Sequence, residues 1–305
     1  MTTTALGLSP NRHMHALPKP AAQSESPETL GARSRPRMST RNRLLFLLTG
    51  WLIVLMPFLF WWNTWFGRRL SEQRLVEYLQ DDKHPRHIQH ALVQLGERMS
   101  RGDSSVRRWY PDAVRLAAYP VEEVRNTDAW VMGQDTSGAG FHDALLKMLG
   151  DSSLTVRGNA ALSLVRFGDA TGRPQIIELL QPATVNAPQA GTVTDTATAG
   201  TAIHQGGVVA KLQDNGKVIE VRSPISGRLR ELQEQAGQTV ASGAEIATID
   251  PGTEQVWEAL RALYLIGQPE DLAAVLPYER ELPDIPDHVR QQAVETEKAI
   301  RGREK

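Results

Sequence analysis

Three histidines stand at a spacing that would bring their imidazoles to one side of a helix. His84, His87 and His90 follow one another at i, i+3 and i+6, and residues three apart are neighbours on a helix surface. Imidazole is a common ligand of divalent metals, so the group could hold an ion. A solvated helix face fits the same spacing. Because the surroundings are polar and no carboxylate completes an obvious ligand set, we favour the solvated face and predict no metal site.

Other catalytic chemistry is not indicated by the sequence. The chain has no cysteine, which excludes disulfides, thiolate metal sites and cysteine nucleophiles. Gly138-Ala139-Gly140 is a lone flexible loop with no strand before it, so it does not make a phosphate cradle. No nucleophile motif and no pair of carboxylates in a catalytic context is present. We therefore predict a protein that is not an enzyme and carries no cofactor.

Length and charge narrow the classes of function further. The chain has 305 residues, which is enough for roughly two domains. Its formal net charge is -1 and 23% of its residues are charged. Nucleic-acid binders usually carry a basic excess on one face. We therefore expect a protein partner, whose identity the sequence does not give, and no nucleic acid.

An uncharged apolar stretch predicts a membrane-spanning helix. Residues 1–42 are rich in Thr, Ser, Pro, Ala and Arg and are predicted to form a disordered tail. Leu44 to Trp62 then carries no charge and would span about 28 Å as a helix, close to the ~30 Å core of a bilayer. We predict a transmembrane helix over residues 43–66. A cleaved signal peptide has a shorter apolar core, and a buried core helix would not end in clustered tryptophans and arginines.

Helical units that resemble one another make up much of the remaining chain. The clearest unit runs from Asp151 to Gly168, with Val156, Ala160 and Leu164 on one predicted helix face. A shorter helix follows it from Pro174 to Leu180. A valine-arginine pair recurs along the chain, at positions 124–125, 156–157 and 289–290.

This recurrence resembles HEAT repeats, over about residues 70–180 and 253–302. The resemblance implies an all-α solenoid, in which each unit buries its apolar face against its neighbours. Such arrays usually offer a surface to a partner rather than a catalytic site. The positions implied to pack the repeats together are Asp151, Val156, Arg157, Asp287, Val289 and Arg290.

Between these helical regions, residues 182–252 contain an internal repeat typical of β-structure. Pro188 and Gly191 recur 36 residues later as Pro224 and Gly227, and Gly200 and Gly206 recur 37 residues later as Gly237 and Gly243. The glycines fit sharp turns with positive φ, and Asp214-Asn215-Gly216 predicts a hairpin between the two halves. The segment lies between two helical regions, so its ends are expected to lie close together.

The proline and glycine pattern of both halves resembles the biotinyl/lipoyl domain, a flattened all-β barrel with pseudo-twofold symmetry. Carrier members of that family attach biotin or lipoate to a lysine at the tip of the central hairpin. Aligned with that pattern, Gly216 takes the tip position, Lys217 is one residue away, and the flanking methionines are missing. One residue along a strand turns a side chain to the other face. We therefore predict an unmodified domain.

A second branch of that family is the periplasmic adaptor, or membrane fusion, proteins, which pair a membrane helix with an unmodified lipoyl-like domain. The chain departs from them because it has a tight turn where they insert a long helical hairpin, and helices where they add β-barrels. The overall prediction is a multidomain, non-catalytic adaptor. It would be anchored in the cytoplasmic (inner) membrane by a single helix, with its soluble part in the periplasm, and serve a transport or envelope complex.

Two alternatives remain open. One is a biotin or lipoate carrier subunit of a membrane enzyme, which would use Lys217. The other is an accessory protein or chaperone that faces the cytoplasm and is built on the helical repeats.

Overall fold

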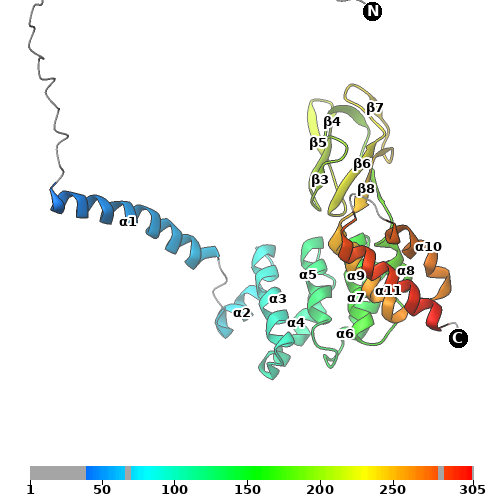
Figure 1. Ribbon diagram of the computed structural model, residues 1–305, viewed down its shortest axis with the longest axis horizontal. Helices are drawn as coiled ribbons and strands as arrows, with labels where there is room; N and C mark the ends of the chain where they lie inside the picture. The colour runs from blue at the N-terminus through cyan, green and yellow to red at the C-terminus, as the bar shows by residue number, and fades with distance from the viewer. Residues whose placement is uncertain (1–38, 66–69, 281–284, 304–305) are drawn as a thin grey trace, which may run out of the picture. The chain divides into compact units, whose positions relative to one another are not determined.

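The computed structural model describes residues 39–65, 70–280 and 285–303 (Figure 1). The chain divides into two compact units, Met1–Arg68 and Arg69–Lys305. In the first unit the described element is helix α1, Thr40–Trp65.

The prediction of a transmembrane helix at 43–66 is wrong. None of the helices in the described ranges combines the length and the apolar character needed to cross a membrane. In α1, Thr49 and Gly50 interrupt the apolar run, and polar residues stand near both ends. The predicted single-pass inner-membrane location loses its support for the same reason. Of the predicted disordered tail, residues 1–38 lie outside the described residues, while Thr40 to Asn42 already belong to α1.

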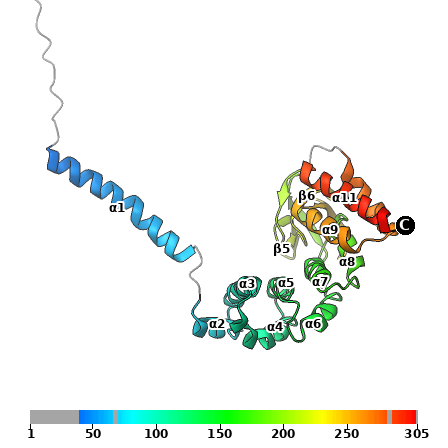
Figure 2. The ribbon, with the colours of Figure 1, turned by 60° about the horizontal axis from the view of Figure 1, so that its bottom comes forward.

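Pairs of short helices form the first part of the second unit. Side chains provide caps at several starts: Ser71 Oγ accepts a hydrogen bond from the Arg74 amide before α2, and Ser153 Oγ accepts one from the Val156 amide before α7. Helices α3, α5 and α7 lie side by side in chain order (Figures 1 and 2). The helices of this part are α2 Glu72–Leu79, α3 Pro85–Ser100, α4 Tyr110–Leu116, α5 Glu122–Met132, α6 Phe141–Met148, α7 Leu154–Arg166 and α8 Arg173–Glu178, with a 3₁₀ turn at Ser104–Trp109.

Eight strands follow and form two four-stranded antiparallel sheets. One sheet has the order β1-β8-β6-β3 and the other β5-β4-β2-β7. Their apolar side chains form a core separate from those of the helices, around Val193, Leu212 and Leu229. The strands are β1 Ala183–Asn186, β2 Gly191–Thr196, β3 Ala202–Ile203, β4 Val208–Asp214, β5 Lys217–Arg222, β6 Gly227–Leu232, β7 Thr239–Val240 and β8 Glu245–Pro251.

The sequence repeat appears in the sheets as a pseudo-twofold relation. Strands β2, β3 and β4 recur as β6, β7 and β8, so the order of one sheet maps onto the order of the other. Even an irregularity of pairing is repeated. A register shift lies between Val193 and Asp195 in β2, and another between Leu229 and Glu231 in β6. The two halves therefore share their strands and also the bulges that bend them.

The chain returns to helices directly after β8. Because β1 pairs with β8, with Ala183 opposite Ile249, the two ends of the β-segment lie side by side, as expected for an insertion. Helix α9, Thr253–Ile266, packs on α7, α8 and α11, Asp287–Arg303, and a shared core joins Ala161 and Ile176 to Leu260. Short turns connect α9 to α11: the 3₁₀ turn Pro269–Asp271, α10 Leu272–Val275 and the 3₁₀ turn Leu276–Glu279.

Candidate functional site

The turn between β4 and β5 is the first candidate site, because the sequence resemblance places the lysine of carrier domains at this turn. Asp214 pairs with Lys217, which leaves Asn215 and Gly216 as the two central residues. Both have positive φ, 48° and 80°. Two-residue hairpin turns require this conformation, because it matches the right-handed twist of the two strands that the turn connects. Asn215 tolerates this conformation better than most residues. Lys217 is exposed and lies in the first position of β5, beside the turn.

The other predicted turn residues of the β-segment fall into two groups. Gly227 opens β6 in close contact with β8, where an added Cβ would clash with the carbonyl oxygen of Asp250. Gly191 is the matching residue of β2, and its Cβ would lie 3.1 Å from the Gln213 oxygen. Pro188 and Pro224 stand just before these strands. The remaining glycines have positive φ and lie in turns: Gly200, Gly206, Gly237 and Gly243.

The base of the β-segment is bonded to the helices. Gln205, in the turn after β3, donates through Nε2 to Glu122 Oε1 at 2.9 Å and to Thr155 Oγ1 at 2.8 Å. Ser153 Oγ donates to the same Glu122 oxygen at 2.7 Å. Leu154 packs against the core of the sheets. A cavity of about 440 Å³ lies beside these contacts, between α7, α8 and β1.

Arginines of equivalent position link neighbouring helical units. Arg125 binds Asp151 through Nε at 2.6 Å and Nη2 at 2.9 Å, and its Nη1 donates to the carbonyls five and six residues before it. Arg157 contacts Glu178 at 2.8 Å and donates to the carbonyls five and six residues before it. Arg290 donates to Asp287 within its own helix at 2.8 Å. Val156 and Val289 are buried.

These ties hold down the pKa of Asp151. Burial raises that pKa, but the hydrogen bond from Arg125 and the amide of Ser153 outweigh it, so the pKa lies below its usual value. Side chains of α7 add further links to α5. Asn159 Nδ2 donates to Asn126 Oδ1 at 2.8 Å, and Ser163 Oγ donates to the Ala129 carbonyl at 2.8 Å.

A groove runs along α5, α7, α9 and α11. It has a volume of about 720 Å³. Large apolar side chains that line it are partly open to solvent, with Trp130, Tyr264 and Leu265 exposed at 38%, 44% and 62%. Charges of both signs, among them Arg261 and Glu258, stand between them. A surface of this kind can bind a partly apolar peptide or helix.

Comparison with known proteins bears on the β-segment. Residues 183–249 match the model of a family described as "Biotin-requiring enzyme". Residues 183–249 form a biotinyl/lipoyl domain. The match covers this segment and not the helices on either side.

Solved structures add likenesses at low identity. A single-chain, multi-domain long-chain acyl-CoA carboxylase is 16% identical over 32% of this chain and 10% of its own, with a TM-score of 0.23. The urea carboxylase of Kluyveromyces lactis is 15% identical over 41% of this chain and 10% of its own, with a TM-score of 0.22. An engineered protein is 17% identical over 76% of this chain and 80% of its own, with a TM-score of 0.38. The chain spans about a tenth of each carboxylase. No curated protein matches the sequence.

His84, His87 and His90 do not form one group in the structure. His90 Nε2 lies 3.0 Å from Gln94 Nε2, apart from the other two. Asp81, which the sequence reasoning left out, lies between His84 and His87. The sequence carried a signal for this: Pro85 fits the first turn of a helix, which leaves His84 before the helix and able to turn back towards Asp81.

Proposed function

We propose that the chain is a non-catalytic scaffold for a protein partner, in which HEAT-like helical repeats carry a biotinyl/lipoyl domain that is not modified. The observation that carries the proposal is the turn between β4 and β5. Its two central residues are Asn215 and Gly216, so no lysine stands where a carrier would hold its prosthetic group.

The mounting of the biotinyl/lipoyl domain supports the same proposal. A carrier must bring its group to more than one site, which requires its domain to move. Here both ends of the domain continue into helices of a shared core, and Gln205 bonds its base to Glu122 and Thr155. The domain is therefore held on its support, which suits a fixed binding surface better than a moving arm.

The helical part supports a binding role through its groove. Apolar side chains exposed to water, in a concave surface between charged residues, are a usual feature of protein-binding sites. Equivalent ties at Arg125 and Arg157 in consecutive units favour a stacked repeat array, which offers such a surface without catalytic groups.

The modification test is made on the full chain. The protein is produced in cells that contain active biotin and lipoate ligases, and its intact mass is measured, with a known acceptor domain in the same cells as the control for ligase activity. We expect the mass of the unmodified chain. An added biotinyl or lipoyl group that disappears in Lys217→Arg would make the chain a carrier and overturn the proposal.

The mounting is tested by Gln205→Ala. Removing the two hydrogen bonds at the base should speed hydrogen exchange at the junctions around Ala183 and Gly252, while the core of the sheets, which is separate, keeps its protection. Thr239→Ala, on an exposed strand position, is the matched control. A domain that is already mobile in the wild type would show the same exchange in all three proteins.

The binding role is tested in the groove. Leu265→Asp places a charge among the exposed apolar side chains, and Val218→Asp makes the same change on exposed β5, away from the groove. We expect a co-purifying protein that is lost with Leu265→Asp and kept with Val218→Asp. Identical co-purifying proteins for the wild type and both variants would contradict a partner site in the groove.

A further inference from the structure

The turn between α2 and α3 brings together three side chains of types that can ligate metals. Asp81 lies in this turn, His84 is the residue before α3, and His87 lies in the first turn of that helix. The backbone fixes their spacing, because the His84 amide donates to the Asp81 carbonyl at 3.0 Å and the His87 amide to the His84 carbonyl at 2.8 Å. Pro85 opens α3 with a φ suited to a helix start.

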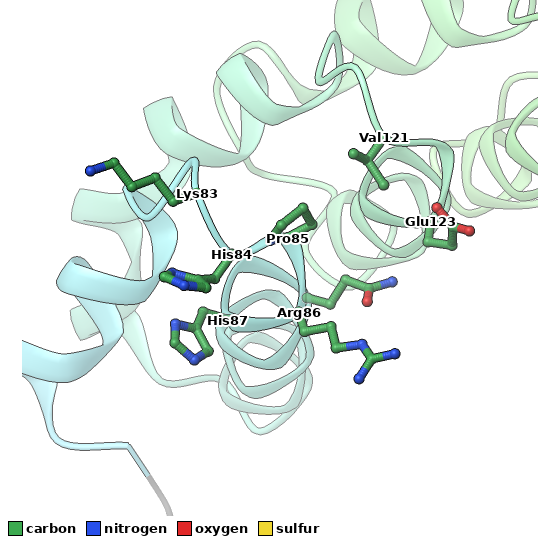
Figure 3. Close-up of a pocket in the computed structure, with 8 residues that line it drawn as sticks. Lys83, His84, Pro85, Arg86, His87, Val121 and Glu123 are labelled. Carbon is green, nitrogen blue, oxygen red and sulfur yellow. The ribbon is translucent and has the colours of Figure 1, made fainter.

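The side chains converge on one carboxylate. His84 Nδ1 lies 2.8 Å and His87 Nδ1 2.7 Å from the same Asp81 oxygen, and ligating atoms of the three residues all lie within 4.8 Å of one another. Figure 3 shows the two imidazoles on the same side of the start of α3, with Arg86 extending away from them. The His87 ring stacks on Tyr78, with 4.2 Å between centroids and 7° between planes, which fixes its orientation.

We propose that Asp81, His84 and His87 bind a divalent first-row transition metal, for which Zn²⁺ is the probe. Two imidazole nitrogens and one carboxylate oxygen form a donor set used by zinc sites that keep a position open and by iron sites of the facial type. At ~2.1 Å from a tetrahedral ion, two ligand atoms are about 3.4 Å apart. The observed 2.7 and 2.8 Å from ring nitrogen to carboxylate oxygen are hydrogen-bond distances, so each ring nitrogen must move about 0.6–0.7 Å away from the Asp81 oxygen when the metal replaces the shared protons.

That movement is small for this part of the chain. The side chain of His84 is 62% exposed and that of His87 41%, so the His84 ring in particular can turn about its own bonds. The cluster borders a cavity of about 580 Å³ that is open to solvent. The fourth position of the metal is therefore left to water or to a donor atom from another molecule.

His90 is excluded from the set by the same geometry. Its ring lies 6.2 Å from that of Tyr78 and its Nε2 contacts Gln94. A ligand set chosen by helical spacing alone would consist of the three histidines. In the structure the third member of the group is Asp81, and His90 lies outside it. This difference gives the proposal its control.

The test measures Zn²⁺ binding to the full chain by titration calorimetry near neutral pH, and Co²⁺ binding by visible absorption. We expect one ion per chain at the site, with affinity lowered at least 10–100-fold in Asp81→Asn, His84→Ala and His87→Ala, because loss of an outer partner alone costs about that much. His90→Ala and His142→Ala should bind as the wild type does. Circular dichroism without metal checks that each variant is folded.

Three results would overturn the proposal. One is the absence of Zn²⁺ and Co²⁺ binding to the folded wild-type chain. Another is binding that persists unchanged in His84→Ala and His87→Ala, which would place the ion elsewhere. The third is a loss of binding in His90→Ala equal to that in His84→Ala, which would restore the histidine trio in place of the cluster with Asp81.

Discussion

Asp128 of α5 is fully buried, and neither of its carboxylate oxygens has a hydrogen-bond partner among the described residues. Burial raises the pKa of this carboxyl well above its ordinary value, and the positive charge of Arg115 opposes the rise without removing it. We predict that Asp128→Asn, which keeps the shape and removes the ionisation, makes the helical part more stable at neutral pH.

The size of the effect follows from the ionisation, because an asparagine at this position would lack the same hydrogen-bond partners. A buried polar group without a compensating hydrogen bond costs about 1–3 kcal/mol in proteins. An ionisable group adds a dependence on pH. Because the pKa of Asp128 is higher in the folded than in the unfolded chain, the folded chain binds the extra proton, and its stability falls as pH rises from the unfolded pKa, about 3.9, towards the folded one. The slope in that window is about 1.4 kcal/mol per pH unit.

Asp128→Asn should therefore match the wild type near the lower end of that window and become more stable than it by about 1.4 kcal/mol for each further pH unit, until the pH passes the folded pKa. In a unit of this size the gain corresponds to a melting temperature higher by about 2–4 °C per kcal/mol. The assay is thermal and urea unfolding, followed by circular dichroism across the pH range. Asp143→Asn, whose side chain is 83% exposed, is the control and should change stability by about 0.5 kcal/mol or less. A gain that does not depend on pH, or a loss, would refute the reasoning and imply that Asp128 is ionised and paired in solution.

Three further substitutions test contacts within the helical part and within the biotinyl/lipoyl domain. Arg125→Lys keeps the charge and loses the two-pronged contact with Asp151, so it should cost about 1–3 kcal/mol, measured by urea unfolding. Because the folded pKa of Asp151 is lowered, the stability that this carboxylate contributes is present above its unfolded pKa and lost as pH falls through its folded one, and the cost should shrink in acid. Gly227→Ala drives a Cβ into the Asp250 carbonyl and should cost more than about 3 kcal/mol. Gly243→Ala, at φ 80° with open space around it, should cost about 1–2 kcal/mol, and equal losses for the two variants would refute the steric argument.

The biotinyl/lipoyl domain could be read from the sequence because its signals are local. The same bends recur in the two halves, at Pro188 and Gly191 and again at positions 224 and 227. Apolar residues alternate with polar ones along the strands between these bends. A backbone that must pass close to another, as at Gly227, demands glycine whatever the rest of the chain does. The sequence therefore carried the repeat of this domain, including the hairpin at Asn215 and Gly216.

Features that depend on distant or irregular contacts were harder to predict. The spacing of His84 and His90 predicted that both lie on one side of a helix. Pro85 begins that helix, so His84 lies outside it and contacts Asp81. Asp151 and Arg157 were predicted only as positions that tie helical units together, and the partner of Asp151, Arg125 of the preceding unit, was not predicted. The apolar run before residue 66 predicted a membrane helix that the described residues do not support.

The relation between the two sheets has a consequence for where the chain tolerates new sequence. In the pseudo-twofold relation, the end of β4 corresponds to the end of β8. The tight turn after β4 and the junction with α9 after β8 are therefore equivalent positions of the domain. At the junction after β8 the chain already continues into a large additional structure, the helices that begin with α9. We expect the turn after β4 to accept an inserted domain as well. A fluorescent protein inserted between Asn215 and Gly216 would then label the end of the biotinyl/lipoyl domain that lies away from the helices. Strands β4 and β8 have seven residues each, which separates the turn after β4 from the base of the domain by about 23 Å. A label at that turn therefore lies away from the groove between the helices.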